Sequence, residues 1–449
     1  MVYEEHIENL REVIEGLIEA DDLSGALALF SNRHPADQAD LLEEFEEQAQ
    51  SRLLFALPGS QLAELLEYLD EDRRGELLAQ IPANALAPVL DRLDSDLAVD
   101  IVQDLEPEQA EAVVPLLEER EEVQELLAYP EDTAGGRMST DFVALQKDWT
   151  VQEAIDFLRR QQPDTDHPFY LYVVDAAGAL LGVVNLRSLV TSPPQTPVSS
   201  IVSSVISVLA TDDQEVVAER MRHYNLLVLP VVDENDRLLG VITADDVLDV
   251  QVAEATEDMY HMAGLPDEER LFRPIRESVP PRLAWLMLNL CTALIAASTV
   301  NLFEGTIERV AALAVFMPVV AGMGGNAGIQ TITLVVRSIA LGEVDPRDAS
   351  RVLRHEAVIA LIKGVVIGLV VAAVAWVWKD SIWLGAVVAL ALIANIANAT
   401  LVGVLVPLGL KRLNADPALA SGVIVTTFSD VVGFLVFLGL ASALISRLT

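Results

Sequence analysis

The chain has 449 residues, of which 52% are hydrophobic, and its 68 acidic and 29 basic side chains give a formal net charge of −39. This length exceeds one ordinary domain, and the charge is uneven: residues 1–282 carry 59 acidic and 19 basic side chains, whereas residues 283–449 carry 9 and 10. So acidic a surface excludes nucleic acid as a partner and favours cations, and a single cysteine, Cys291, excludes a disulfide framework and a zinc ribbon.

Residues 1–130 carry short apolar repeats at helical spacing, separated by turn-forming residues such as Pro58-Gly59 and Pro107. The chain begins with acidic residues rather than with the basic and apolar stretches of a cleavable signal, so no such signal is expected. We predict an all-α domain in which the segment 62–105 forms successive hairpins of a superhelical array. Its acidic side chains are expected on the outer faces.

Residues 131–250 contain an internal repeat with a period of 58 residues. Apolar runs at 172–175 and 229–233 are each followed by a second run, Gly182-Val183-Val184 in one copy and Gly240-Val241-Ile242 in the other. This pattern of strand, turn, strand and helix resembles paired cystathionine-beta-synthase (CBS) modules. The resemblance implies an α/β tandem pair that senses nucleotides or ions.

The two copies differ at the positions that hold ribose and phosphate in adenosyl-binding CBS modules. The second copy has a hydroxyl and a carboxylate there, Thr243 and Asp246, whereas the first copy has Asn185 and Ser188. We therefore predict at most one nucleotide site per chain, with ATP as a candidate ligand.

Residues 251–282 are predicted to connect the repeat with the rest of the chain. A helix is expected over 249–262, with the carboxylates of Glu254, Glu257 and Asp258 on a recurring face. The chain then passes through Pro280-Pro281 into an apolar segment. Such a connector could transmit movement from the soluble part.

Residues 283–449 contain apolar stretches long enough to cross roughly 30 Å of hydrocarbon as helices. Five are predicted, at 283–303, 310–336, 357–378, 381–410 and 417–446. The third contains only Lys363 and the fifth only Asp430 as ionisable residues. We therefore predict a five-helix membrane domain with short connections between antiparallel neighbours.

Basic residues predict the orientation of this domain. The loop around 337–354 holds four arginines and the loop after the fourth span holds Lys411 and Arg412, whereas 304–309 and 379–380 hold one basic residue each. This bias places the N-terminal half in the cytoplasm and the C-terminus outside.

The second span contains a glycine-rich segment, Gly322-Met323-Gly324-Gly325-Asn326-Ala327-Gly328-Ile329-Gln330. Glycines weaken a helix, and irregular backbone within a membrane is tolerated where it lines an aqueous cavity. The predicted pore-lining residues are Gly325, Asn326, Gly328 and Gln330. The alternative is close helix packing through small residues.

Asp430 lies near the middle of the fifth span, where inserting a carboxylate into the membrane costs free energy. We therefore predict a functional role for it. Lys363 is the alternative, purely structural partner. In a homodimer a two-fold axis would bring two such carboxylates together, an arrangement that suits a hydrated Mg²⁺. Asn395 and Asn398 add polar groups to the fourth span.

Catalytic motifs are weak. Arg354-His355-Glu356 begins like the zinc-protease pattern HExxH, but Ile359 stands where the second histidine belongs. We interpret this stretch as the start of a cytoplasmic helix, and we predict no enzymatic activity.

The chain resembles the MgtE magnesium channel family over its whole length. The resemblance rests on the order of its predicted domains and on two motifs, Gly-Gly-Asn-Ala-Gly-Ile-Gln in the second span and Ser-Asp-Val-Val-Gly in the fifth. The resemblance implies a helical N-domain at 1–130, tandem CBS domains at 131–250, a connecting (plug) helix at 251–282 and a pore domain at 283–449. It further implies a homodimeric Mg²⁺ channel of the cell membrane, closed when cytoplasmic Mg²⁺ is high.

The resemblance also implies which carboxylates bind metal. Asp430 corresponds to the pore aspartate, and Glu64, Asp96 and Asp100 correspond to the N-domain sensor. The implied sensor residues of the CBS pair and connector are Asp213, Glu215, Asp246, Asp249, Glu254, Glu257 and Asp258. Asn225 replaces an acidic residue of some members, which implies a weaker or missing site there.

Three alternatives stay open on the sequence. The excess acidic charge could be an adaptation to salt rather than a sensor. The transported ion could be Co²⁺ or Mn²⁺, or the chain could export a cation. A CBS-regulated intramembrane enzyme would need catalytic ligands that the sequence does not show.

Overall fold

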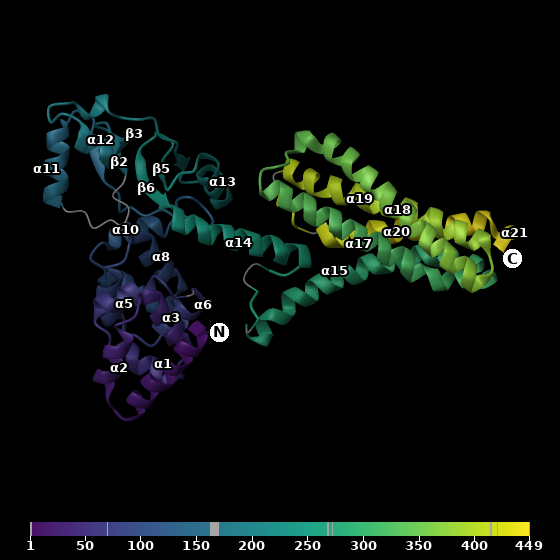
Figure 1. Cartoon of the computed structure of the whole chain (residues 1–449), viewed down its shortest axis with the longest axis horizontal. Coiled ribbons are helices and arrows are strands. Elements are labelled where there is room, and N and C mark those ends of the chain that lie inside the picture. The colour runs from purple at the N-terminus through teal and green to yellow at the C-terminus, as the bar shows by residue number, and fades with distance from the viewer. Residues whose placement is uncertain are drawn as a thin grey trace. The chain divides into compact units, whose positions relative to one another are not determined.

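The computed structural model describes residues 2–69, 71–161, 170–266, 269–271, 273–413, 415–419 and 421–448. The chain forms two compact units, Met1–Val250 and Gln251–Thr449 (Figure 1). The predicted multi-domain architecture is confirmed: a helical N-terminal part, an α/β pair and a part with five long apolar helices follow one another along the chain.

The first unit begins with ten short α-helices. They are α1 (Val2–Glu19), α2 (Leu23–Phe30), α3 (Pro35–Glu44), α4 (Glu47–Ala56), α5 (Gly59–Leu66), α6 (Glu71–Leu78), α7 (Ala83–Leu90), α8 (Ser95–Asp104), α9 (Pro107–Val113) and α10 (Arg120–Leu126). Helices two apart in sequence contact one another, in the series α3, α5, α7 and α9, and α6 contacts α8. This is the predicted stacked array, and prolines or glycines start α5, α7 and α9 where the sequence indicated turns.

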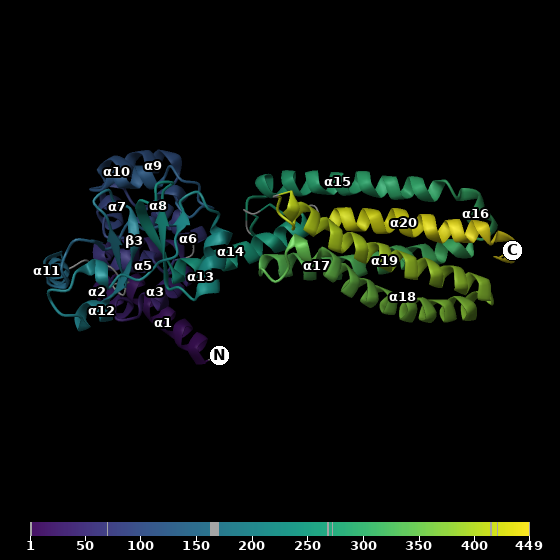
Figure 2. The same cartoon turned by 90° about the horizontal axis from the view of Figure 1, so that it is seen from above.

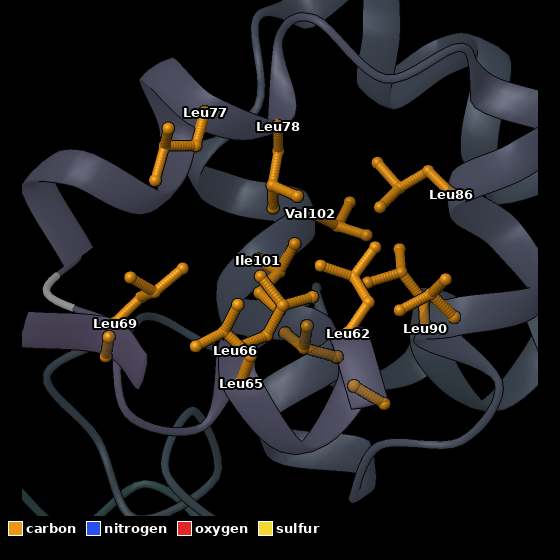
Figure 3. Close-up of a cluster of buried hydrophobic side chains, with 14 of the residues drawn as sticks. Leu62, Leu65, Leu66, Leu69, Leu77, Leu78, Leu86, Leu90, Ile101 and Val102 are labelled. Carbon is orange, nitrogen blue, oxygen red and sulfur yellow. The ribbon is translucent and has the colours of Figure 1, made fainter. Parts of the chain in front are cut away.

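Leucines fill the core of this array. Leu62, Leu65 and Leu66 of α5 face Leu78, Leu86 and Leu90 of α6 and α7, and Ile101 and Val102 of α8 close the cluster (Figure 3). Each such side chain contributes about 1.5–3 kcal/mol when fully buried. Because the apolar faces of the helices pack into this core, the acidic side chains lie on the outer faces or at junctions.

The predicted CBS pair consists of two sheets with the same topology. Its elements are β1 (Ala144–Gln146), α11 (Val151–Gln161), β2 (Tyr170–Val174), β3 (Leu180–Asn185), α12 (Leu186–Thr191), β4 (Val208–Leu209), α13 (Gln214–Tyr224), β5 (Val228–Val232) and β6 (Leu238–Thr243). In each sheet the first strand pairs parallel with the second, and the second antiparallel with the third. Tyr172 pairs with Val183 and Pro230 with Val241, so the predicted repeat extends to the register.

Two equivalent glycines, Gly182 and Gly240, make room for the segments that cross between the two copies. Ser203, which leads into the second copy, pairs with Val183 of the first sheet, and Ser139, which leads into the first copy, pairs with Val241 of the second. A Cβ at Gly240 would lie 2.7 Å from the Ser139 carbonyl oxygen, and one at Gly182 would overlap Ser203. Each glycine therefore admits the segment that crosses from the other copy.

The second unit contains the apolar helices. They are α15 (Ile275–Asn301), α17 (Ala312–Ala340), α18 (Ala349–Lys379), α19 (Ile382–Arg412) and α20 (Ser421–Ala443), with short helices α16 (Glu304–Arg309) and α21 (Ile445–Leu448). Within the described ranges, five helices are long and apolar enough to cross a membrane. Helix α14 (Ala244–Ala263) contains the division between the units, so one continuous helix runs from the CBS pair into the second unit.

Helix α19 is the centre of the membrane part. It packs against α17, α18 and α20, and α15 packs against α20 (Figure 2). Small residues allow close approach: Gly364 and Gly368 of α18 face Ile393 and Ala389 of α19. In the apolar interior of this bundle, any polar side chain needs a specific partner.

Three sequence expectations differ from the structure. The first long helix begins at Ile275 rather than after Pro280-Pro281, so both prolines lie inside its second turn, where each lacks the N–H for one intrahelical hydrogen bond. Helix α17 runs unbroken through the glycine-rich segment, so no irregular backbone forms there. Helix α18 begins at Ala349, and Glu356 is a buried residue within it rather than part of an exposed cytoplasmic helix start.

Candidate functional site

Helix α17 has two different faces along its glycine-rich segment. Gly322, Asn326 and Gln330 are exposed, and a Cβ at Gly322 would meet only open space. Gly324 and Gly328 lie on the opposite, buried face. One face therefore packs against neighbouring helices, and the other presents two amide side chains.

Glycines of the buried face let α20 approach α17. A Cβ at Gly325 would lie 3.9 Å from Thr426 Cγ2, and one at Gly328 would overlap Val425 and lie 3.4 Å from Ala399 Cβ of α19. The alternative of close packing through small residues applies to Gly328, which was predicted to line the pore, whereas Asn326 and Gln330 are on the exposed face and their pore-lining role stays a prediction.

Asp430 lies on α20 at the level of this segment. It follows Thr426, which faces Gly325, and precedes Gly433, which faces Asn395 beside Gly324. Asp430 is half-buried, and no described residue, Lys363 included, forms a hydrogen bond or ion pair with it. A carboxylate with which no described residue forms a hydrogen bond or ion pair is suited to hold a cation that keeps its water.

Helix α19 supplies two asparagines next to α20. Asn398 Nδ2 donates to the Phe428 carbonyl oxygen at 3.2 Å. Asn395 is completely buried and donates through Nδ2 to the Val320 carbonyl oxygen of α17 at 2.8 Å. The sequence left the role of both residues open.

Sequence reasoning missed a second buried carboxylate, Glu356. Only 5% of it is exposed, and it accepts a hydrogen bond from Thr331 Oγ1 of α17 at 3.3 Å. Ala360, one turn further along α18, packs with Ala327 and Ile396. An acidic residue next to the long apolar stretch of α18 could have marked Glu356 as buried. The resemblance of Arg354-His355-Glu356 to a zinc-protease motif drew the interpretation elsewhere.

In the first unit, Asp96 of α8 and Asp246 at the start of α14 face one another. Burial first, and the Asp246 carboxylate second, raise the pKa of Asp96 well above its ordinary value. Burial also raises the pKa of Asp246, opposed by hydrogen bonds from Thr243. Asp96 Oδ1 is shielded from solvent, and no group in the described part of the chain donates to it.

This arrangement is unfavourable for two bare carboxylates and favourable for a cation between them. Asp100 lies on the same face of α8, one turn away, and pairs with Arg137 at 3.7 Å. The helical array and the CBS pair thus each supply a carboxylate to one junction, formed by residues that the sequence resemblance implied as metal ligands.

The other predicted sensor carboxylates of this unit are more exposed. Glu64 on α5 and Asp249 on α14 are exposed, and Glu215 is half-buried at the start of α13. Asp213 caps α13 by accepting a hydrogen bond from the Glu215 backbone N–H at 2.8 Å. Of these four residues, Asp249 acts on the junction, because its carboxylate adds, after burial and Asp245, to the raised pKa of Asp246.

On the connector, Glu257 meets two residues that the sequence did not single out. Glu257, His261 and Asp416 each offer a ligand atom, and these atoms lie within 4.8 Å of one another. His261 Nδ1 is 2.6 Å from Asp416 Oδ2. Asp416 follows the last basic residue of the fourth span, where no periodic pattern could mark it. Glu254 and Asp258 are half-buried on the same helix.

The predicted nucleotide residues are asymmetric in the structure as well. In the second copy, Asp246 accepts hydrogen bonds from the Thr243 backbone N–H at 3.1 Å and from its hydroxyl. In the first copy, Asn185 accepts from the Ser188 N–H at 2.7 Å, so no carboxylate is present. Asn225 ends α13 in a left-handed conformation with φ of 52°, which asparagine tolerates better than most residues.

Comparison with known proteins assigns families to three parts of the chain. The family described as the MgtE intracellular N domain matches residues 33–132, the CBS domain family matches 134–193 and 198–253, and the family described as divalent cation transporter, MgtE, matches 317–440.

Curated relatives match over most of the chain. The magnesium transporter MgtE of Thermus thermophilus is 38% identical over 356 residues, 78% of each protein. That of Enterococcus faecalis is 37% identical over 326 residues, 72% of each. The crystal structure of the cytosolic domain of the Mg²⁺ channel MgtE in complex with ATP is 36% identical with a TM-score of 0.51, covering 54% of this chain and 99% of that one. The crystal structure of the soluble part of a magnesium transporter is 32% identical with a TM-score of 0.50, covering 56% and 99%.

Proposed function

The chain belongs to the MgtE family of divalent cation transporters, and we propose that it conducts Mg²⁺ past Asp430 and is closed by Mg²⁺ bound to its cytosolic carboxylates. It is a membrane magnesium transporter with a soluble cytosolic N-terminal part and five apolar helices, and its family transports ions rather than catalysing a reaction. The path, the gate and the assembly are our proposals.

The unpartnered Asp430 supports the ion path. A mid-helix carboxylate without a basic partner in the described part of the chain has no evident structural use, and it lies at the level of the Gly324–Asn326 segment. Gly325, Asn326, Gly328 and Gln330 are proposed to shape the path, with the amides lining it and the glycines setting its width. Two chains related by a two-fold axis would pair the Asp430 carboxylates, so a homodimer is the proposed assembly.

The junction of Asp96 and Asp246 is the observation that carries the gating proposal. A hard divalent cation prefers carboxylate oxygens, and the shielded, undonated Asp96 Oδ1 fits such a ligand. Residues 1–130 and 131–250 would then be sensor modules, residues 251–282 a plug and residues 283–449 the pore. Asp100, Glu64, Asp213, Glu215 and Asp249 add further proposed sensor charge.

The connector supplies a second proposed cation site. Glu257, His261 and Asp416 join α14 to the loop before α20, and Glu254 and Asp258 add charge beside it. Since α14 runs from Asp246 to His261, a cation held at either end would restrain the same helix. ATP is a proposed ligand of Thr243 and Asp246 only. We propose that the C-terminus lies outside, an orientation that the basic-residue bias supports.

Flux through purified protein in liposomes tests the path. Asp430→Ala should abolish Mg²⁺ influx or its selectivity while the protein still assembles, and Asp380→Asn, at a helix end in a left-handed conformation that Asn tolerates, should conduct like the parent. Wild-type influx and selectivity in Asp430→Ala would refute the path. Preference for Co²⁺ or Mn²⁺ over Mg²⁺ in the parent would instead refute the substrate.

A further inference from the structure

Asn395 is a fully buried amide in the middle of α19, the central helix of the membrane part. A polar side chain in this environment loses free energy unless it is hydrogen-bonded, and a buried amide between membrane helices usually joins them. Its contacts therefore indicate what it holds in place.

The amide nitrogen joins α19 to α17. Asn395 Nδ2 donates to the Val320 carbonyl oxygen at 2.8 Å. In an α-helix that carbonyl also accepts from the N–H four residues on, so Asn395 adds a second donor at the turn that precedes Asn326. The bond fixes where the glycine-rich segment begins relative to α19.

Two glycines on different helices enclose the same amide. A Cβ at Gly324 of α17 would lie 2.7 Å from Asn395 Cγ, and a Cβ at Gly433 of α20 would lie 2.6 Å from Nδ2 and 2.8 Å from Cγ. Real Cβ contacts essentially never fall below 3.0 Å. Both glycines are therefore required for Asn395 to occupy its place, and the amide sets how closely α17 and α20 approach.

The carbonyl end of the amide argues against a role in packing alone. Asn395 Oδ1 is buried, and no donor reaches it among the described residues. The would-be Cβ atoms of Gly324 and Gly433 lie 3.1 and 3.0 Å from it, so glycine Cα–H groups are its neighbours. An apolar side chain of similar volume would avoid this unsatisfied oxygen, so the amide is retained at a cost to stability.

The enclosing glycines lie next to the proposed ion path. Gly433 follows Asp430 by three residues on α20, and Gly324 precedes Asn326 by two residues on α17. We propose that Asn395 is a positioning residue that sets the separation and register of α17 and α20, and thereby the fit of the ion path to Mg²⁺. This inference rests on the proposed function, because it assumes that Asp430 lies on the path.

The test measures Mg²⁺ and Ca²⁺ influx separately in liposomes that contain the full chain. Asn395→Leu keeps the branched shape and the number of heavy atoms but removes the donor. It should lower the ratio of Mg²⁺ to Ca²⁺ influx by about tenfold, the change that about 1.4 kcal/mol of differential binding produces. Leu392→Val, a matched change one turn away in the apolar cluster of α19, should leave the ratio unchanged.

A pair of substitutions separates positioning from stability. Gly324→Ala should disturb assembly and the flux ratio, because the added methyl meets Asn395. In the Asn395→Ala background the same Gly324→Ala change should be tolerated, so the two effects should be strongly non-additive. If Asn395→Leu does not assemble, this pair still gives the measurement. An unchanged flux ratio in assembled Asn395 variants, or additive effects of the pair, would overturn the proposal.

Asp430→Asn, measured in parallel, separates the proposed ion path from the proposed role of Asn395. If Asp430→Asn conducts and selects like the parent, the proposed path fails, and the role of Asn395 fails with it. If Asp430→Asn loses flux while Asn395→Leu keeps the parent ratio, only the inference about Asn395 is overturned.

Discussion

Asp96 shows how a single residue connects burial with sensing. Burial first and the neighbouring Asp246 second disfavour its charged form, and burial also disfavours the charged form of Asp246. Without a cation, the junction between α8 and α14 therefore costs free energy at neutral pH. With Mg²⁺ bound between the two carboxylates, the same junction would be stabilised by about 2.7 kcal/mol at a hundred times the dissociation constant.

Asp96→Asn should therefore stabilise the soluble unit 1–250 when Mg²⁺ is absent. Removing one buried charge is expected to give about 1 kcal/mol, or roughly 2–4 °C in melting temperature for a unit of this size. The same variant should lose most of the stabilisation by Mg²⁺. Thermal unfolding with and without millimolar MgCl₂ measures both effects, with Glu108→Gln on the exposed side of α9 as the control. A lower melting temperature without Mg²⁺ would contradict this account.

The pH dependence of the same unit follows from the raised pKa of Asp96. An acid whose pKa is higher in the folded state binds more protons folded than unfolded, so the free energy of unfolding falls as pH rises through that window. Without Mg²⁺, the contribution of Asp96 should thus increase stability as pH falls from its raised pKa toward its ordinary value of 3.8. Denaturant titrations of the parent and Asp96→Asn at several pH values isolate it, and an identical pH profile for both proteins would exclude it.

The buried Glu356 is predicted to stabilise the packing of two membrane helices. Its bond with Thr331 joins α18 to α17 behind the glycine-rich segment. Glu356→Gln keeps the acceptor and should change stability little, whereas Glu356→Ala leaves a buried Thr331 hydroxyl without this partner and a cavity, at a cost of about 2–4 kcal/mol. Melting in detergent, with the exposed Glu343→Ala as control, checks the order of the variants. Equal stability of Glu356→Ala and the parent would contradict it.

At the scale of elements, the strongest sequence signals were periodic. The 58-residue repeat predicted two equivalent sheets, and charge-free runs predicted five long helices, because both patterns record burial along one segment. The start of α15 could not be predicted, since Pro280 and Pro281 read locally as helix breakers. Nor could the partners of Asn395 be predicted, because Gly324 and Gly433 stand on helices far away in sequence.

The asymmetry of the CBS pair predicts one nucleotide site per chain. Calorimetric titration of the soluble unit with ATP should show a single site that Thr243→Val abolishes, because the hydroxyl that orients Asp246 is lost. Asn185→Ala in the first copy should leave binding unchanged, since it caps α12 and offers no carboxylate. Two equal sites, or loss of binding in Asn185→Ala alone, would contradict the assignment.

At the scale of the whole molecule, α14 is the element through which the two units are joined. It carries Asp246 at its first turn and the Glu257–His261 pair near its end. Millimolar Mg²⁺ should therefore protect residues 251–270 from proteolysis, whereas KCl at equal ionic strength should not, because screening is non-specific and bridging needs carboxylates in place. Equal protection by both salts would leave only an adaptation to salt.

Closure of the pore by cytoplasmic Mg²⁺ is the central claim, and flux as a function of Mg²⁺ on the side of the soluble unit tests it most directly. Swinging a gate from 1:99 to 99:1 requires roughly 5.5 kcal/mol of differential binding. The parent should close as Mg²⁺ rises, whereas the double variant Asp96→Asn with Asp246→Asn should stay open to higher Mg²⁺. The control is Glu108→Gln with Glu111→Gln, which removes the same charge from an exposed surface and should close like the parent. Identical closure curves for all three proteins would contradict the account.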